Sequence, residues 1–411
     1  MSAGAQTETA HPRAMPPATT VSGGLFLGVC LLLIAFNLRP LFSSLSVLLP
    51  EVSQALGMSG AIAGYLTTLP VLCLGLFAPF APTLADRYGV ERVLLLVLIL
   101  IGAGTALRAF DAVTALFVGS AMAGAGIAMG NVLLPSVVKR DFPGHVALMT
   151  GLFTMSLCGG AAAAAAFALP LAEVGGSWRF GLGVWAVPAF VMAFLWLPHT
   201  LRSARPASTR RLPGIRLVHD GLAWQVACFM GLQSALAYCV LGWMAPILRW
   251  RGLDGVTAGF YVSASIMLQV ATCLLVPPLA ARLRSQSLFN AGLALLAAAA
   301  LLGLIIAPME WLPVMVLLQG VGQGGLFAIA MTVIILRSPD PRVAARLSGM
   351  SQTIGYLLAA FGPMLVGMLH AATGGHAASG WLFAGIGLAA MLSGWGAGRP
   401  LLVQPREVAT R

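Results

Sequence analysis

The first long apolar stretch, residues 24–50, decides how the rest of the chain is read: GLFLGVCLLLIAFNLRPLFSSLSVLLP. It contains a single charge, Arg39. At about 1.5 Å per residue, a helix over this stretch spans roughly 40 Å, which is enough to cross a bilayer. A cation near its middle costs at least about 2.5 kcal/mol unless it faces protein, water or an anion. Because Pro40 also kinks the helix beside the charge, the stretch predicts a membrane span with a ligand-binding cation at its centre.

The composition extends this reading to the whole chain. Of its 411 residues, 59% are hydrophobic and only 9% are charged, whereas a soluble domain carries about 25% charged residues. The six cysteines all lie in apolar runs, where they are expected to be small buried side chains without disulfides or metals. We therefore predict an all-α membrane protein with twelve transmembrane helices. The expected spans are residues 24–50, 59–82, 91–110, 112–137, 146–171, 179–198, 223–248, 257–280, 286–307, 312–336, 345–371 and 380–398.

The loop charges predict the orientation. With the N-terminus in the cytoplasm, Arg108, Arg179, Arg249 and Arg251 fall outside and Arg39 lies in the membrane, which leaves 18 of the 23 basic residues inside. This asymmetry follows the positive-inside rule and predicts cytoplasmic N- and C-termini. The net charge of +11 is then explained by topology and contact with membrane lipid, and no nucleic-acid partner is expected.

The chain divides into two halves of six spans. We expect a tail over residues 1–22, a first half over 23–198, a basic linker over 199–222, a second half over 223–398 and a tail over 399–411. Four weak matches relate the halves at offsets of 195 or 196 residues: Leu84–Arg87 with Leu279–Arg282, Gly124 with Gly320, Pro50 with Pro246, and Asn37 with Gln233. This plan resembles the major facilitator transporters, which implies two six-helix halves related by a pseudo-twofold axis, with substrate held between them.

The loop APTLADRYGVER, residues 81–92, resembles the major facilitator signature G-x-x-x-D-R-x-G-x-R/K-R/K. It departs from that signature at Pro82 and Glu91. The resemblance implies that the acid latches the cytoplasmic gate; the alternative is an ordinary charged turn that sets topology. The gating candidates are Asp86, Arg87, Gly89 and Arg92.

Four further segments narrow the resemblance. They read NLRP (37–40), YLTTLPVLCLGLFAP (65–79), GNVLLPSVVKRDFP (130–143) and LRSPDPRVAARLSGMSQTIGYLLAAFGP (336–363). Together they resemble the cyanate and 2-nitroimidazole porter family of the major facilitators, over about residues 24–398. This implies secondary active or facilitative transport of a small anionic or polar solute across the inner membrane by a monomer, without choosing the solute.

Polar side chains near the middle of the spans are the candidates for solute binding. Arg39 offers a fixed cation that can bind an anion in a bidentate manner; the alternative is an arginine satisfied by backbone carbonyls or by packing. For the amides and tyrosines, hydrogen bonding between helices is the alternative role. The candidate substrate-binding residues are Asn37, Arg39, Asn131, Gln233, Tyr238, Gln269, Gln323 and Tyr356.

Several chemical classes lack support in the sequence. No Asp, Glu, Lys or His lies near the middle of a span, so a coupled proton would have to be carried by His370, Glu51 or the solute itself. There is no phosphate-binding loop and no metal-spaced cluster, so we expect no enzyme, cofactor or metal site. Two alternatives stay open: an exporter of broader specificity, for which Trp243, Phe260 and Tyr261 could supply apolar contacts, and a receptor that binds without transport.

Overall fold

The computed structural model describes residues 21–202, 215–404 and 406–407, and within them twelve helical segments are long and apolar enough to cross a membrane. The predicted twelve-span α fold is confirmed. The first half contains α1 (Val21–Asn37), α2 (Pro40–Ala55), α3 (Gly60–Phe77), α4 (Phe80–Tyr88), α5 (Val90–Leu107), α6 (Val113–Asp141), η1 (Pro143–His145), α7 (Val146–Val174), α8 (Trp178–Gly183) and α9 (Ala186–Arg202). The second half contains α10 (Gly221–Trp250), α11 (Gly255–Ala281), α12 (Ser287–Ile306), η2 (Met309–Trp311), α13 (Leu312–Leu336), α14 (Pro341–Ala359), α15 (Phe361–Thr373) and α16 (Ala377–Ala397).

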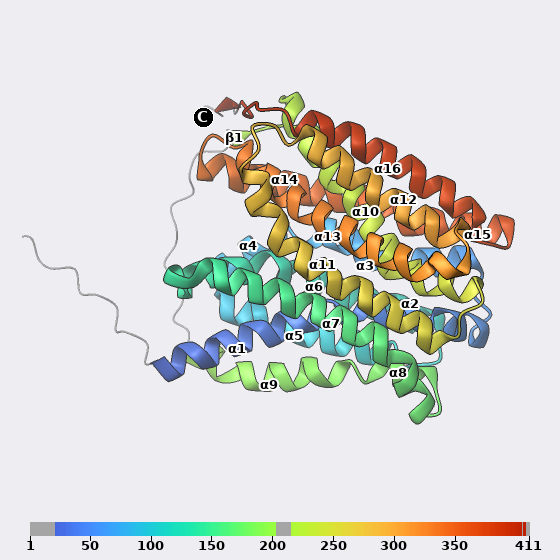
Figure 1. Cartoon of the computed structure of the whole chain (residues 1–411). Coiled ribbons are helices and arrows are strands. Elements are labelled where there is room, and N and C mark those ends of the chain that lie inside the picture. The colour runs from blue at the N-terminus through green and yellow to red at the C-terminus, as the bar shows by residue number, and fades with distance from the viewer. Residues whose placement is uncertain (1–20, 203–214, 405, 408–411) are drawn as a thin grey trace, which may run out of the picture.

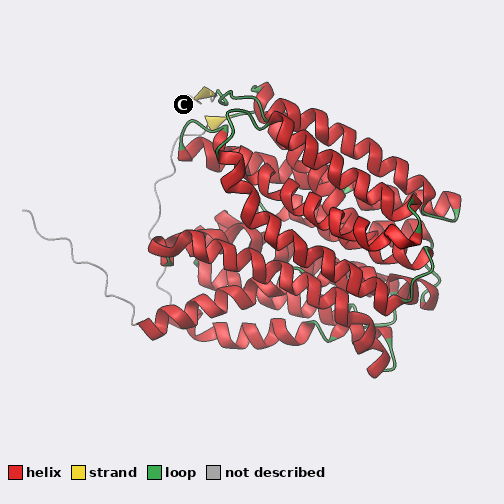
Figure 2. Cartoon of the chain, viewed as in Figure 1, coloured by secondary structure: helices red, strands yellow, loops and turns green. Residues whose placement is uncertain are grey.

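The two halves form two bodies that lie side by side, the first from blue to green and the second from yellow to red (Figure 1). The helix α1 begins, and α16 ends, on the same side of the molecule, which we call the terminal side; the opposite side is the distal side. One feature was not predicted: β1 (Ile215–Arg216) pairs antiparallel with β2 (Arg406–Glu407) on the terminal side (Figure 2). Half of the predicted basic linker, residues 203–214, lies outside the described residues.

Several spans are broken helices. The first span consists of α1 and α2, separated at Leu38 and Arg39, and Pro40 is the first residue of α2. Proline suits this position because the first amide of a helix has no partner within the helix in any case. Breaks of the same kind separate α3 from α4 at Pro79 and α14 from α15 at Ala360. The predicted kink beside Arg39 is therefore a true interruption, which leaves the arginine between two helix ends.

The internal repeat is visible in how glycines let helices approach each other. A Cβ on Gly124 of α6 would lie 2.9 Å from the Cα of Pro70 in α3. A Cβ on Gly320 of α13 would lie 2.6 Å from the carbonyl oxygen of Ser265 in α11. Small residues permit such close helix packing in membranes. The matched glycines thus serve the same purpose in both halves, since each holds the fourth span of its half against the second.

The halves meet tightly on the distal side. Glu51 of α2 accepts a hydrogen bond from Arg249 of α10 at 2.6 Å, which forms an ion pair across the two halves. Nearby, a Cβ on Gly64 of α3 would lie 2.9 Å from the Cα of Gly367 in α15, so these two backbones are in direct contact. The terminal side instead holds a vestibule of about 720 Å³, lined from both halves. The structure is therefore closed on the distal side and open on the terminal side.

Arg108 corrects the sequence reading of the turn between the third and fourth spans. We expected it in an outer loop, but its side chain is 0% exposed and donates from Nη1 to the carbonyl oxygen of Leu41 at 3.1 Å. Its Nε and Nη2 have no hydrogen-bond partner. Burial lowers the pKa of this guanidinium to about 9. Arg108 is thus buried within the first half, where its guanidinium donates a hydrogen bond to the first turn of α2.

Candidate functional site

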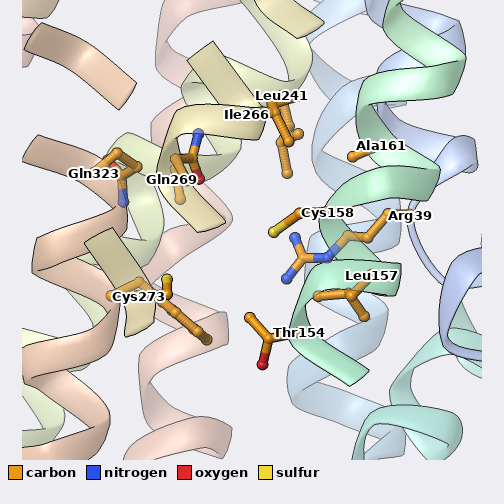
Figure 3. A pocket seen from close by; sticks show the side chains of 12 residues that line it. Arg39, Thr154, Leu157, Cys158, Ala161, Leu241, Ile266, Gln269, Cys273 and Gln323 are labelled. Atoms are coloured by element: carbon orange, nitrogen blue, oxygen red, sulfur yellow. The ribbon is translucent and has the colours of Figure 1, made fainter. Parts of the chain in front are cut away.

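A cavity of about 60 Å³ lies between the halves in the middle of the molecule. Four helices supply most of its wall: α7 from the first half and α10, α11 and α13 from the second (Figure 3). The lining is mostly apolar, with Leu157, Leu241, Ile266 and Phe327 among its members. Its polar residues are Arg39, Thr154, Cys158, Gln269, Cys273 and Gln323.

Arg39 reaches this cavity from the break between α1 and α2. Figure 3 shows its guanidinium pointing across the cavity toward the second half, beside Cys158. Its Cζ lies 5.8 Å from the centre of the Tyr238 ring, and Tyr238, Tyr356 and Cys158 are the groups that interact with its charge. Within the described residues it forms no ion pair with a carboxylate and no hydrogen bond to a backbone carbonyl. Its partners are thus two phenols and a thiol, and none of them neutralises the cation.

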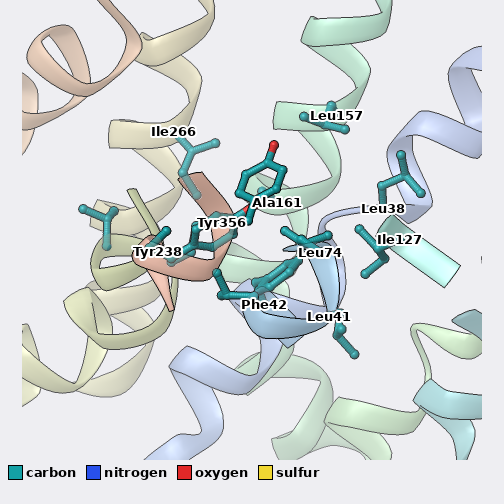
Figure 4. Packing of buried hydrophobic residues seen from close by; sticks show 14 of the residues in the cluster. Leu38, Leu41, Phe42, Leu74, Ile127, Leu157, Ala161, Tyr238, Ile266 and Tyr356 are labelled. Carbon is teal, nitrogen blue, oxygen red and sulfur yellow. The ribbon is translucent and has the colours of Figure 1, made fainter. Parts of the chain in front are cut away.

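An aromatic cluster packs beside Arg39, but its members are not among the residues that line the cavity. The rings of Tyr238 and Tyr356 meet edge to face with their centres 6.2 Å apart, and Phe42 lies 5.3 Å from Tyr238 (Figure 4). All three are buried. Edge-to-face pairs are favourable beyond the area that they bury. The cluster thus brings the predicted Tyr238 and Tyr356 close to Arg39 without placing them in the cavity wall.

Two of the predicted glutamines form a pair. Gln323 of α13 donates from Nε2 to the backbone carbonyl of Gln233 in α10 at 3.2 Å, and both side chains are buried. Its Oε1 has no partner. An unpaired buried acceptor is costly, but this oxygen is enclosed by protein, so a donor on a solute reaches it only after neighbouring side chains move. Gln269 of α11 lines the same cavity, whereas Gln233 lies behind Gln323.

The two predicted asparagines do not lie at the cavity. Asn37 donates to the carbonyl oxygen of Leu33 at 2.8 Å, and it lines a separate depression against α9 together with Pro188. Asn131 lines the vestibule on the terminal side. The reason for Asn37 is the helix break: Asn37 is the last residue of α1 and faces α9, whereas Arg39 lies in the interruption before α2 and reaches the cavity.

The predicted gating loop lies at the terminal end of the first half. Gly89 ends α4 and begins α5 at φ 91° and ψ 144°, a backbone conformation that is almost exclusive to glycine. Asp86, Arg87 and Arg92 are exposed, and Asp86 forms no ion pair with any described residue. Glu91, which departs from the signature, instead pairs with Arg140 of α6 at 2.7 Å. The latch stays a prediction for a conformation in which the terminal side is closed.

The sequence analysis did not predict three small polar residues that line the cavity. Thr154, Cys158 and Cys273 line the cavity, but small polar side chains in apolar helices gave no signal that separates them from ordinary packing. Conversely, the aromatic residues that would favour an exporter lie elsewhere: Trp243 lines a distal cavity and Phe260 is half exposed. No group of three or more metal-ligating side chains occurs among the described residues.

This arrangement can hold a small solute that carries negative charge or strong hydrogen-bond acceptors. The guanidinium supplies the charge, neutral polar side chains such as Thr154 and Gln269 supply hydrogen-bonding groups, and the apolar walls contact the remainder. The low dielectric of the surroundings strengthens such contacts. The geometry therefore places one cation and several neutral polar groups in a mostly apolar chamber at the junction of two bodies.

Comparison with known proteins places the chain in a family. Residues 25–309 match the family model of the Major Facilitator Superfamily, so the chain belongs to this superfamily of transporters. Solved members share the fold: the nucleoside transporter NupG gives a TM-score of 0.73 at 14% identity over 90% of this chain and 99% of that one. The D-xylose-proton symporter gives a TM-score of 0.73 at 12% identity over 93% and 99%.

Relatives of higher identity narrow the group. The chain is 38% identical to the 2-nitroimidazole transporter of Escherichia coli over 88% of this chain and 92% of the relative. It is 30% identical to the cyanate transport protein CynX of the same organism over 84% and 90%, and 38% identical to an uncharacterized transporter, YycB, of Bacillus subtilis over 82% and 85%. The predicted resemblance is confirmed. The protein is a multi-pass membrane transporter of small solutes and not an enzyme, and its two-body fold is consistent with alternating access.

Proposed function

We propose that this transporter moves a small organic or inorganic anion, or a polar heteroaromatic compound, which binds at Arg39 in the central cavity. The single observation that carries the proposal is the guanidinium at the break between α1 and α2, which faces a mostly apolar cavity without a carboxylate partner among the described residues. An unpaired cation at this depth costs several kcal/mol. An anionic or strongly polar solute would remove much of that cost when it binds.

The apolar lining favours a solute with an apolar body over a fully hydrated ion. A planar ring with a carboxylate or nitro group would place its charge or dipole at Arg39 and its ring against Leu157, Ile266 and Phe327. A relative of partial length points the same way: residues covering 18% of this chain are 51% identical to a putative anionic 4-hydroxy-benzoate permease of Thauera aromatica. Cyanate and 2-nitroimidazole, named for the longer relatives, also combine a small size with strong acceptors.

The proposal also includes the orientation of the protein in the membrane, its moving units and its solute-binding residues. We infer that the terminal side faces the cytoplasm of a bacterial inner membrane, because most basic residues flank the spans on that side. We further propose that the two halves, residues 23–198 and 223–398, rock as units within a monomer surrounded by lipid. The candidate solute-binding set is narrowed to Arg39, Tyr238, Gln269, Gln323 and Tyr356, with Gln233 as support.

A binding screen tests the proposal. Purified protein is heated with nitrate, cyanate, 4-hydroxybenzoate or 2-nitroimidazole, and the shift of the melting temperature is recorded; a solute at 100 times its Kd stabilises by about 2.7 kcal/mol. Arg39→Gln is expected to abolish the shift, because it removes the charge at nearly the same length. Asn37→Ala lies two residues away on the outward face and serves as the matched control, with an unchanged shift. An Arg39→Gln protein that folds and keeps the full shift would reject the site.

A further inference from the structure

A second polar cluster lies between the halves on the distal side, outside the proposed solute site. It surrounds a cavity of about 280 Å³. The first half contributes its wall from α2 and α3, and the second half from α10, α15 and the turn before α16. The lining residues are Leu49, Pro50, Ser53, Met58, Gly60, Ala63, Trp243, Pro246, Arg249, Trp250, His370 and His376. The distal cavity thus lies where the two halves must separate for the distal side to open.

Two histidines are stacked in this cavity. The rings of His370 and His376 lie 4.4 Å apart at an angle of 9°. Trp243 and Trp250 meet the edge or face of His376 at 5.7 and 5.8 Å. His370 also touches the first half, because its Cδ2 would lie 2.9 Å from a Cβ on Gly60. The pair is therefore part of the contact that closes the distal side.

The surroundings of His376 disfavour its protonated, charged form. It is 2% exposed, and its Nδ1 is buried without a hydrogen-bond partner. It lies in the turn after the eleventh span, outside the membrane-spanning segments. Burial, and secondly the neighbouring His370, lower its pKa to about 4. The closed distal side thus holds this imidazole neutral at neutral pH.

The charged groups around the pair are few. Arg249 of α10 lines the same cavity, and its charge is shared with Glu51 of α2 at 2.6 Å. The residues of α3 that line the cavity, Gly60 and Ala63, carry no charge. The closed cavity therefore contains one cation that already has its partner and no free acid to compensate a proton on the histidines. The second carboxylate oxygen of Glu51 is buried and unpaired, but Arg249 holds the first.

We propose that His376, stacked on His370 in the distal gate, is a proton-binding site, and that protonation of His376 opens the gate. A charged His376, stacked on His370 between two tryptophans, is 2% exposed and has no hydrogen-bond partner at Nδ1 in the closed state. Separation of the halves exposes the cavity wall, so that water can hydrate the charged imidazole. The proton is thus a ligand that binds the distal-open state in preference to the closed one.

The direction and size of the effect follow from linkage. The closed state lowers the pKa of His376 to about 4, whereas a solvated histidine titrates near 6.5. The proton therefore favours the open state, and the preference grows as the pH falls below about 6.5. Acidification from pH 7 to pH 5 is expected to shift the gate equilibrium toward the open state by up to about twentyfold.

Distance measurement on the whole protein tests the proposal. Spin labels are attached at Gln54→Cys and Glu310→Cys, exposed distal positions in the first and second halves. The partly exposed cysteines Cys158, Cys228 and Cys273 are first replaced by serine. Pulsed electron paramagnetic resonance in lipid nanodiscs at pH values from 7.5 to 4.5 then reports the separation of the halves. The long-distance population is expected to rise with a midpoint between about 4 and 6.5.

One variant and one control make the result decisive. His376→Gln keeps a polar side chain of similar size but binds no proton, and it is expected to lose most of the pH response. His145→Gln removes an exposed histidine on the terminal side and is expected to keep the response. A distance distribution that ignores pH, or a His376→Gln protein with the full response, would overturn the proposal. Solute-induced stabilisation of His376→Gln at pH 7.5, measured without labels and with Cys158 and Cys273 in place, tests the Arg39 site separately, so the two ideas fail independently.

Discussion

Adding one methyl group at Gly367 should force the distal side open. A Cβ there would come closest to the Cα of Gly64, and it would lie 2.7 Å from the carbonyl oxygen of Gly60. Both are backbone atoms that cannot rotate away, so α3 and α15 must separate by about 1 Å to reach an ordinary contact of 3.4 Å. Overpacking of this kind costs about 1–3 kcal/mol. That energy is released when the halves part, so Gly367→Ala should shift the gate equilibrium toward the distal-open state by about 5- to 150-fold.

The same pair of spin labels measures this shift at pH 7.5. Gly367→Ala is expected to increase the long distal distance and to slow uptake, because the return to the terminal-open state becomes unfavourable. Gly385→Ala is the matched control: this glycine is also inside a membrane helix, but nothing lies within 4 Å of an added Cβ. If Gly367→Ala folds and gives the wild-type distance distribution, then the contact between α3 and α15 does not close the distal side, and the reasoning fails.

Three smaller predictions follow from other contacts. Glu51→Gln breaks the partly exposed ion pair to Arg249 and should favour the distal-open state by about 0.2–1 kcal/mol. The same distance measurement on the double variant Glu51→Gln with Arg249→Gln should show little further shift, because the pair is already broken. A double variant whose shift equals the sum of the two single shifts would contradict the prediction. Gly89→Ala imposes a side chain at φ 91° and should cost about 1–3 kcal/mol, seen as a lower melting temperature with unchanged solute affinity. Arg108→Met removes a buried charge that has one hydrogen bond and should leave the melting temperature unchanged or higher; a large loss would indicate a partner that the structure lacks.

Much of the fold could be predicted because the bilayer imposes simple lengths. Each span needs about twenty apolar residues. The sequence contains twelve such stretches, and most basic residues lie in the loops at one end of the spans. The repeat at about 196 residues identified Pro50 and Pro246 as equivalents, and both line the distal cavity. The β1–β2 pair carried no signal, because two-residue strands are too short for a sequence pattern.

The site was only partly predictable because the sequence indicates how deep a residue lies in the membrane better than it indicates which way its side chain points. Asn37 and Arg39 lie at the same depth, but one faces α9 and the other faces the cavity. Arg108 lies in the predicted turn, but its burial was not expected because a charge beside a turn is normally solvated, whereas here α2 supplies a carbonyl for it. The partner of His376 in the fold, His370, is close in sequence, yet their stacking depends on the turn at Gly374.

The central claim, that Arg39 holds the transported solute, is tested most directly by flux. Proteoliposomes containing the wild-type protein, Arg39→Lys, Arg39→Gln or Asn37→Ala are supplied with radiolabelled 4-hydroxybenzoate or cyanate, and initial uptake rates are compared. Removing one partner of a buried charge-assisted contact costs about 2–5 kcal/mol, so Arg39→Gln should reduce kcat/KM by at least about thirtyfold. Arg39→Lys should retain part of the activity and Asn37→Ala nearly all of it. Wild-type uptake by a folded Arg39→Gln protein would contradict the account.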